Sequence, residues 1–459
     1  MSESVFDIAI IGAGVVGSAI AREFAKNNLK ICLIDAASDV GEATSKSNTA
    51  ILHTGFDMTP GSLESKLVAS GYHLLKDYAA EVNIAVEKLG ALLVAWSEEE
   101  LANLPKIEEK AVANGYKECE VISKEELYKL EPNLGEGALA ALTVPGEWII
   151  DPWAPIVAFA TQAKLAGAEI KLSTKVESIN TADHLITLNT NAGQIQTHYL
   201  INAAGLYSDE IDANLGITDF KITPRRGELI VFDKLSRRLI NHVILPVPSS
   251  MGKGVLVAPT VFGNIMLGPT AENLDDKTAT GSTNAGLASL LQKGRKIAPK
   301  LLAEEITATY AGLRAASEHS DFQIRLHNLD GKQRYVTVGG IRSTGLSASM
   351  AIAIYVKELL SKAGMELNGE RALPEIKMNN LGEAGLRSYQ DSEKIKTEPL
   401  HGAIICHCER TTTQEVLDAL TSPIPPTSLS GLGRRSRAGL GRCQGFYCHS
   451  EIRKLMEKA

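Results

Sequence analysis

Residues 6–35 read FDIAIIGAGVVGSAIAREFAKNNLKICLID, and they carry the strongest indication of the fold class. The apolar run at residues 8–11 leads into GAGVVG at residues 12–17, a helix-like segment follows, and a second apolar run ends on Asp35. This order predicts a strand, a turn, a helix and a second strand. It is the context in which a G-x-G-x-x-G motif binds a dinucleotide.

Each glycine of the motif has a distinct structural role in such a turn. Gly12 permits the tight turn, Gly14 lets a pyrophosphate approach the backbone, and Gly17 lets helix and strand pack closely. The N–H groups at the helix start form the anion site, and Asp35 stands where a carboxylate accepts hydrogen bonds from ribose hydroxyls. The alternative is a tight turn in an α/β sheet without a ligand. On this stretch alone, FAD and NAD fit equally well.

The composition is that of a globular protein with more than one domain. A chain of 459 residues is expected to form two or three domains, and 44% hydrophobic with 22% charged residues is typical of soluble proteins. A net charge of −7 argues against a nucleic-acid binder. The apolar start does not resemble a signal peptide, because Asp7 interrupts it and no basic residue precedes Arg22. No apolar run is long enough to span a bilayer. We therefore expect a cytoplasmic protein, free or held at the inner face of the membrane by partners, and an oligomer is compatible with the sequence.

Two further strand-to-helix turns occur at residues 199–208 and 335–346. Strand-like runs between residues 221 and 310 predict an antiparallel sheet that covers the reacting end of the cofactor. Residues 41–48, GEATSKSN, are small and hydroxylated, so their backbone can run close to a ligand; the alternative is an ordinary loop rich in turn formers.

Three glycine-containing turns, near Gly12, Gly205 and Gly345, resemble the FAD-dependent oxidoreductases of the D-amino-acid-oxidase and glycerol-3-phosphate-dehydrogenase superfamily over about residues 5–370. The resemblance implies an α/β fold with a Rossmann-like FAD-binding domain and an antiparallel-sheet substrate domain. The expected flavoprotein part spans residues 1–375, with FAD-binding parts at about 1–90, 145–220 and 330–370 and the substrate-covering sheet at about 91–145 and 221–330.

The same resemblance implies which residues contact FAD. Asp35 would meet the adenosine ribose, although glutamate is commoner there in the family. Val176 would meet adenine through its backbone and is expected on an inner strand, and the helix start after the third turn would face the pyrimidine edge of the flavin. The full expected set is Gly12, Gly14, Val15, Val16, Gly17, Asp35, Thr44, Ser45, Asn48, Thr49, Val176, Ala204, Gly205, Gly340, Gly345, Leu346 and Ser347.

Four of the six cysteines, Cys406, Cys408, Cys443 and Cys448, lie in the last part of the chain. In a chain without an export signal, such clustering favours a metal or cluster site over disulfides. The C-x-C and C-x₄-C pairs resemble the bacterioferritin-associated-ferredoxin-like [2Fe-2S] domain, which implies a small α-rich unit at residues 401–459 after a linker at 376–400. A structural zinc site is the alternative, because four cysteines are also a zinc set.

A flavin domain joined to this cluster domain resembles the A subunits of the anaerobic glycerol-3-phosphate dehydrogenases. The resemblance implies a dehydrogenase of a small anionic hydroxy compound, with glycerol 3-phosphate first and L-2-hydroxyglutarate or another 2-hydroxy acid second. A hydride would pass to flavin N5, and electrons would leave through the cluster to an electron-accepting protein or a quinone-linked membrane subunit. The sequence ASEHSDFQI after Arg314 departs from the pattern expected of glycerol-3-phosphate enzymes. An amine or imino-acid dehydrogenase and a non-catalytic redox or iron-sensing module are the alternatives.

Three residues are the candidates for catalysis and substrate binding. His53 is a candidate base beside the flavin, or else a flavin contact or a packed loop histidine. Arg314 and Arg342 are candidate anchors for a carboxylate or phosphate, because arginine offers paired N–H donors; the alternative is a surface ion pair. Four arginines between residues 434 and 442 would favour a negatively charged cluster or dock an acidic partner.

Overall fold

The computed structural model describes residues 5–182, 184–248 and 254–458. Its centre is a parallel sheet built on β1 (Phe6–Ile11), with β2 (Ile31–Ile34) and β9 (Glu169–Lys171) on one side and β12 (Gly193–Asn202) and β20 (Lys332–Gly339) on the other. Both faces of such a sheet are covered, which explains why residues 8–11 of β1 and the whole of β2 are continuous apolar runs. The predicted strand, turn, helix and strand are thereby confirmed.

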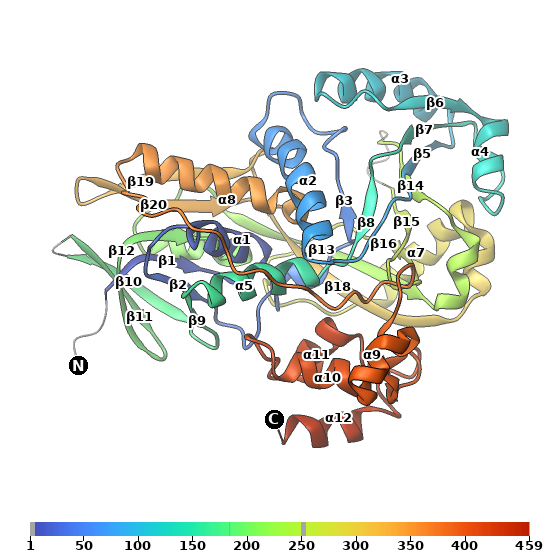
Figure 1. The fold of residues 1–459 in the computed structure, drawn as a ribbon. Helices are drawn as coiled ribbons and strands as arrows, with labels where there is room; N and C mark the ends of the chain where they lie inside the picture. Colours follow the sequence, from blue (N-terminus) through green and yellow to red (C-terminus); the bar gives the residue numbers. More distant parts are fainter. Residues whose placement is uncertain (1–4, 183, 249–253, 459) are drawn as a thin grey trace.

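Helices cover this sheet and bring the third turn next to the first (Figure 1). Helix α1 (Val15–Phe24) packs against α5 (Ala154–Leu165) and α8 (Gly345–Lys362), and α2 (Leu63–Glu81) packs against α8. The sheet is extended by antiparallel strands: β10 (Val176–Ala182) and β11 (Leu185–Thr190) beside β12, and β19 (Gln323–Leu329) beside β20. The expectation that Val176 lies on an inner strand is wrong, because Val176 opens β10 at the edge of the sheet.

A second sheet of nine strands forms the substrate domain. Along it lie β17 (Glu272–Asn273), β13 (Ile222–Phe232), β16 (Ile265–Gly268), β15 (Leu256–Pro259), β14 (Val243–Pro246), β5 (Ala91–Ala95), β7 (Ala140–Val144) and β6 (Glu120–Ser123), with β18 (Ile306–Ser317) also paired to β13. The sheet is antiparallel as predicted except where β14 runs parallel to β5. These two strands are far apart in the chain, so no hairpin turn fixes their relative direction.

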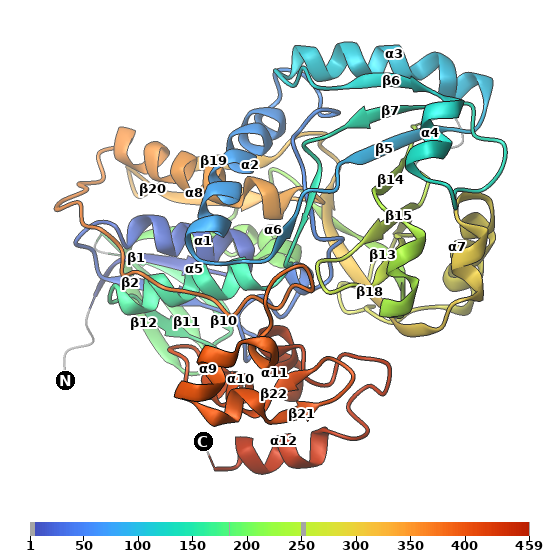
Figure 2. The same cartoon turned by 45° about the vertical axis from the view of Figure 1, so that its right-hand side comes forward.

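Smaller elements complete the flavoprotein part. A three-stranded sheet of β3 (Ile51–Leu52), β8 (Trp148–Ile150) and β4 (Val86–Glu87) contributes residues near the third turn, and α6 (Ser208–Ala213) follows the second turn. Outside the substrate sheet lie α3 (Glu98–Ala113), α4 (Lys124–Leu130) and α7 (Asn284–Ile297) (Figure 2).

The C-terminal unit, residues 404–458, is called the cluster domain below. It contains β21 (Ile404–Cys406), β22 (Thr411–Thr412), α10 (Thr413–Leu420), α11 (Leu429–Ser436) and α12 (His449–Met456), and it has its own small hydrophobic core. Both views place it against the flavoprotein part, near α5 (Figures 1 and 2). The stretch expected as a linker carries α9 (Ser392–Thr397), and its Arg387 is 1% exposed. Within the described residues, no helix has both the length and the apolar character needed to cross a membrane.

Candidate functional site

The glycine turn after β1 leaves no room for side chains. Gly12 has φ +104°, and a Cβ there would lie 2.3 Å from the Ala203 carbonyl oxygen. A Cβ on Gly17 would lie 1.8 Å from the oxygen of Gly12, so these two glycines are required by the packing itself. A Cβ on Gly14 would come within 3.1 Å of Ser45 Oγ, at the open side of the turn. The cradle fits an FAD pyrophosphate at the start of α1.

Asp35 closes this turn from the end of β2. Its Oδ2 accepts the N–H of Ala13 at 2.6 Å and its Oδ1 accepts the N–H of Ala37 at 2.8 Å. Burial raises the pKa of Asp35, and these two N–H groups oppose that rise. Asp35 therefore fixes the turn that meets the phosphates. The contact of Asp35 with a ribose stays a prediction, and so does the adenine contact of Val176. Val176 lies near Asp35, because the N–H of Thr174, two residues earlier, donates to the Asp35 carbonyl oxygen at 2.8 Å.

The loop at residues 44–49 is fixed between the glycine turn and the covering sheet. Ser45 Oγ accepts the N–H of Val15 at 3.0 Å, and Thr44 Oγ1 donates to the Leu313 oxygen on β18 at 2.9 Å. From the same strand, the Tyr310 hydroxyl donates to the oxygen of Asn48 at 3.1 Å. The covering strand is thus attached to the loop that the resemblance places under the flavin. Within this loop Thr49 is half-buried, and Val16 is buried in α1.

The second and third turns meet the first one. The N–H of Ala203 donates to the Ile11 oxygen at 2.8 Å, which brings Ala204 and Gly205 next to the start of α1. Gly340 has φ +64° at the end of β20, and α8 begins at Gly345. The N–H groups in the first turn of α8, at Leu346 and Ser347, have no intrahelical acceptors and can face an electron-rich ring edge.

The half-buried His53 pairs with the buried Glu147 beside this helix start. His53 Nδ1 lies 2.8 Å from Glu147 Oε2, and the His53 N–H donates to Ser347 Oγ at 2.8 Å. Glu147 has no exposed side-chain surface, and its Oε1 accepts both the N–H and the hydroxyl of Thr54. Burial lowers the pKa of His53, but the Glu147 carboxylate, with smaller contributions from Asp57 and Glu64, raises it, and the net shift is upward. The pairing places a proton on Nδ1 and leaves Nε2 as the acceptor.

Glu147 is a site residue that the sequence did not predict. Its partner is 94 residues away along the chain, so no local spacing connects the two. The one available signal was an acidic residue directly before the apolar Trp148–Ile150 strand. A buried carboxylate requires a partner, and only the tertiary structure shows which one.

The two candidate arginines differ in their surroundings. Arg342 Nη2 donates to Glu64 Oε2 at 2.5 Å and to the Ser320 oxygen at 2.6 Å. Arg314 Nη2 donates to the Thr270 oxygen at 2.6 Å, and no carboxylate among the described residues forms an ion pair with it. Burial, with a smaller contribution from Arg225, lowers the pKa of Arg314. The structure thus leaves Arg314 with an uncompensated charge beside Leu313, the residue that accepts from the flavin loop.

The four tail cysteines form two adjoining pairs. Cys406 and Cys448 are buried and in side-chain contact, and Cys408 and Cys443, both half-buried, contact each other. The N–H of Gly439 donates to Cys406 Sγ at 3.5 Å. Burial raises the pKa of Cys443, but backbone N–H groups of the loop before Cys448, together with the Cys408 thiol, lower it, and the net shift is downward. Such donors stabilise thiolates, and two thiolate pairs suit the two irons of a [2Fe-2S] cluster.

The zinc alternative needs a different arrangement. A Cys₄ zinc site requires its ligands to converge on a single ion. The C-x-C and C-x₄-C spacings of the four cysteines are less typical of zinc sites than C-x₂-C pairs, so the donor set favours the cluster.

The arginines that precede Cys443 face the flavoprotein part. Arg434 and Arg435 pair with Asp39, Arg437 pairs with Glu409 inside the cluster domain, and Arg442 pairs with Asp233. The interpretation of this segment as a docking surface for an acidic partner is therefore wrong, because the acidic groups that it meets belong to its own chain.

Comparison with known proteins agrees with both parts. A family model described as FAD dependent oxidoreductase matches residues 7–359, and one described as BFD-like [2Fe-2S] binding domain matches residues 404–458. The glycerol 3-phosphate dehydrogenase of Caloramator mitchellensis is 36% identical over 460 residues, which cover 99% of this chain and 94% of that protein.

Two oxidases are similar to the flavoprotein part. The glycerol 3-phosphate oxidase of Mycoplasma genitalium is 31% identical over 364 residues, covering 77% of this chain and 94% of that protein. The structure of dithionite-reduced L-α-glycerophosphate oxidase from Mycoplasma pneumoniae with FAD bound matches with a TM-score of 0.74 and 31% identity, covering 81% of this chain and 100% of that chain. The chain belongs to the FAD-dependent oxidoreductases, and it carries a BFD-like [2Fe-2S] binding domain at its C-terminal end.

Proposed function

We propose that this protein is an FAD-dependent glycerol-3-phosphate dehydrogenase that passes electrons through its [2Fe-2S] cluster to a redox partner. The observation that carries the proposal is the extent of each likeness. The match to the dehydrogenase covers 99% of this chain, whereas the match to the Mycoplasma genitalium oxidase covers 77% of this chain and 94% of its own. The additional segment is the cluster domain. An enzyme that gave electrons directly to O₂ would have less need of it.

In the proposed reaction, different residues of the chain bind the substrate, take its proton and exclude water. Bound FAD supplies the hydride acceptor, and the protein binds and orients the substrate. Arg314 binds the phosphate through paired donors. His53 Nε2 takes the proton of the hydroxyl group whose carbon is oxidised, and Glu147 stabilises the imidazolium that results. The strand β18, attached to the loop at residues 44–49, covers the site and excludes water.

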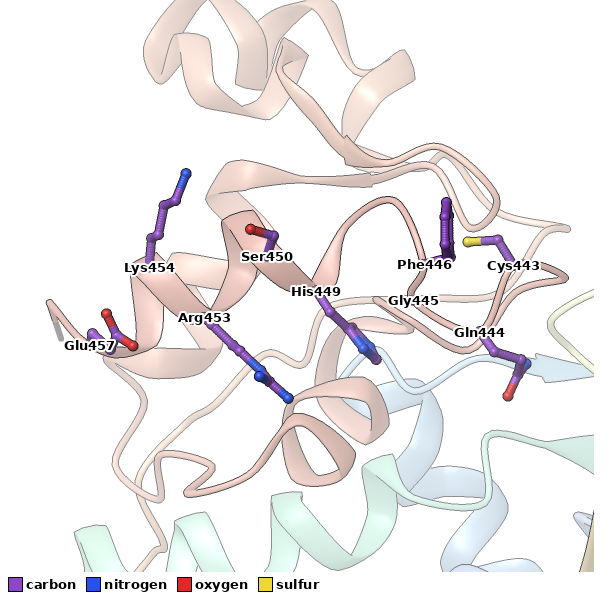
Figure 3. A pocket seen from close by; sticks show the side chains of 9 residues that line it. All are labelled: Cys443, Gln444, Gly445, Phe446, His449, Ser450, Arg453, Lys454 and Glu457. Carbon is purple, nitrogen blue, oxygen red and sulfur yellow. The ribbon is translucent and has the colours of Figure 1, made fainter.

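The partner would approach the outer side of the cluster domain. Phe446 and Tyr447 are 82% and 74% exposed, and they lie between the ligands Cys443 and Cys448. An open cavity of about 680 Å³ adjoins Cys443 and continues along α12 (Figure 3). Exposed aromatic side chains are typical of protein interfaces. An electron-accepting protein or a quinone-linked membrane subunit that contacts them would come close to a cluster ligand.

The surface is tested with the variant Phe446→Ser. We expect slower electron delivery to membrane vesicles that carry the quinone-linked acceptor, with unchanged reduction of ferricyanide, a small acceptor that needs no docking surface. Equal delivery to the vesicles by the variant and the native protein would contradict this assignment.

The substrate is tested by anaerobic titration of the flavin. Glycerol 3-phosphate should bleach the flavin absorbance, whereas L-2-hydroxyglutarate and cyclic amino acids should not. Bleaching by L-2-hydroxyglutarate alone would move the assignment to the 2-hydroxy acids, which share the flavin-domain pattern. If only cyclic amino acids bleach the flavin, the protein is an amine or imino-acid dehydrogenase.

A further inference from the structure

The flavoprotein part and the cluster domain meet at a buried ion pair. Asp39 is 1% exposed and lies in the segment that follows β2. Arg435 reaches both of its oxygens, with Nη2 at 2.6 Å from Oδ1 and Nη1 at 2.7 Å from Oδ2. Arg434 Nη2 adds a contact of 2.8 Å to Oδ2. A Cβ on Gly431 would lie 2.5 Å from the same oxygen, so α11 approaches Asp39 as closely as a glycine allows.

This ion pair is attached to the flavin site. The N–H of Gly41, two residues after Asp39, donates to the oxygen of Ala13 in the glycine turn at 2.9 Å. Three residues further, the chain enters the loop at residues 44–49, whose Ser45 accepts the N–H of Val15. A two-point hydrogen bond between arginine and a carboxylate fixes orientation as well as distance. The position of α11 is therefore tied to the loop that carries the flavin contacts.

A second line of contacts runs from the same loop to a cluster ligand. Trp153 Nε1 donates to the oxygen of Lys46 at 3.0 Å, and its ring stacks on Phe262 with centroids 5.5 Å apart. The Arg437 guanidinium lies 4.1 Å from the centroid of Phe262. Two residues after Arg437, the N–H of Gly439 reaches Cys406 Sγ. The contacts are continuous from the flavin loop to a thiolate.

A third contact fixes the cluster domain to the covering sheet. Arg442 donates to both oxygens of Asp233 at the end of β13, at 2.6 and 3.1 Å. Next to it, Lys234 Nζ lies 3.0 Å from Glu409 Oε2 in the cluster domain. Because the cluster domain contacts both sheets, it cannot rotate about a single hinge. Opening the buried ion pair at Asp39 costs free energy, because each charge would remain unpaired.

We propose that the cluster domain works from this one docked position, and that Asp39, Arg435 and Arg442 are positioning residues for electron transfer between flavin and cluster. The inference rests on the proposed function, in that the substrate supplies the electrons. Oxidation of the carbinol carbon to a carbonyl releases an electron pair and two protons. The electrons cross this interface one at a time, and a one-electron acceptor outside the chain takes each from the cluster. A domain that swings on a tether is the arrangement that the proposal excludes.

The proposal is tested with Arg435→Gln and a control, Lys458→Gln, which also removes one positive charge, from an exposed position just after α12 of the same domain. Anaerobic stopped-flow mixing with glycerol 3-phosphate gives the flavin-bleaching rate, and freeze-quench EPR of the same mixture gives the rate of cluster reduction. We expect cluster reduction in Arg435→Gln to slow by about tenfold or more relative to flavin bleaching. The control should retain the native ratio.

Hydrogen exchange measures docking without any electron transfer. Peptides that cover residues 36–48 and 429–437 should exchange faster in Arg435→Gln than in the native protein and the control, because the interface opens more often. The Arg442 side chain is 47% exposed, so Arg442→Gln should affect folding less than Arg435→Gln. Both measurements are repeated with this variant. Native ratios and native protection in both variants would overturn the proposal.

The outcomes are separable from those of the proposed function. If glycerol 3-phosphate fails to bleach the flavin even in the native protein, the substrate assignment fails. Photoreduction of the flavin with a sacrificial amine then supplies the electrons, and the rate of cluster reduction is compared between the variants and the native protein. A cluster that is reduced equally fast in all variants under photoreduction contradicts the fixed docking whatever the substrate is.

Discussion

Glu147 determines the protonation of His53 from a position without solvent contact. One carboxylate oxygen meets His53 Nδ1, and the other accepts two hydrogen bonds from Thr54. All of its close partners are donors, so the charge of Glu147 is compensated only when the imidazole presents a proton at Nδ1. In the proposed mechanism, this arrangement orients His53 as the base, with its other nitrogen directed to the substrate hydroxyl.

The variant Glu147→Gln tests that arrangement through its pH profile. Glu147 holds the His53 pKa above its ordinary value, and His53 acts as a base only above its pKa. Without the carboxylate, burial dominates, so the acid limb of the kcat/KM profile should move to lower pH while kcat falls by about 10- to 100-fold. Thr54→Val removes a hydroxyl from the same carboxylate and should leave the acid limb near its native position. An unmoved acid limb in Glu147→Gln would show that His53 is not the titrating base.

Arg314 is expected to carry the recognition of the substrate phosphate. The variant Arg314→Gln loses charged hydrogen bonds worth about 1.5–3 kcal/mol, so KM for glycerol 3-phosphate should rise by about 10- to 100-fold. Arg314→Lys should recover part of this loss, because it restores the charge but not the fork. Steady-state kinetics with glycerol and glycerol 3-phosphate compare the two contributions. A KM for glycerol 3-phosphate that stays native in Arg314→Gln would contradict the assignment.

For individual site residues, the sequence predicted the residue types better than the partners that those residues contact. Arginine in TYAGLRAAS and in GGIRSTG indicated two equivalent anion anchors. The structure distinguishes them because Glu64, far away in the chain at the start of α2, pairs with Arg342. Pairing between residues that are distant in sequence depends on how helices and sheets pack, and no local pattern encodes it.

Among the elements, the turn between β1 and α1 was the most predictable. Its requirements are local: a positive φ at Gly12, a close approach at Gly17 and an apolar strand on each side. The parallel pairing of β5 with β14 and the edge position of β10 could not be predicted, because they depend on which strands are neighbours in space. Strand order is a property of the assembled sheet, and alternation along one strand does not report it.

The variant Gly14→Ala tests this turn as a cofactor site. A Cβ there would lie 3.1 Å from Ser45 Oγ, on the side where the pyrophosphate approaches, and the residue has an ordinary φ. We expect FAD affinity to fall by about tenfold or more with little change in the stability of the apoprotein. Gly281→Ala, at an exposed position where a Cβ meets nothing within 4 Å, is the control. Fluorescence titration of the apoprotein with FAD measures both, and native affinity in Gly14→Ala would contradict the site.

Over the whole molecule, the structure joins two modules that the sequence indicated separately. Cysteine spacing is local, so it indicated the cluster domain, and the glycine turns indicated the flavoprotein part. How the two parts are arranged was not predictable, because Arg435 and Asp39 are 396 residues apart and each looks like an ordinary surface charge in the sequence. The arginines that suggested an external partner are the contacts that hold the molecule together.

In the proposed function, electrons from the substrate reach the cluster through the flavin within one chain. The most direct measurement adds glycerol 3-phosphate to the anaerobic protein with no other reductant and records the flavin absorbance and the EPR spectrum together. We expect the flavin to bleach and the signal of a reduced [2Fe-2S] cluster then to grow. If the flavin bleaches but the cluster stays EPR-silent, and dithionite still reduces that cluster, electron transfer from flavin to cluster is contradicted.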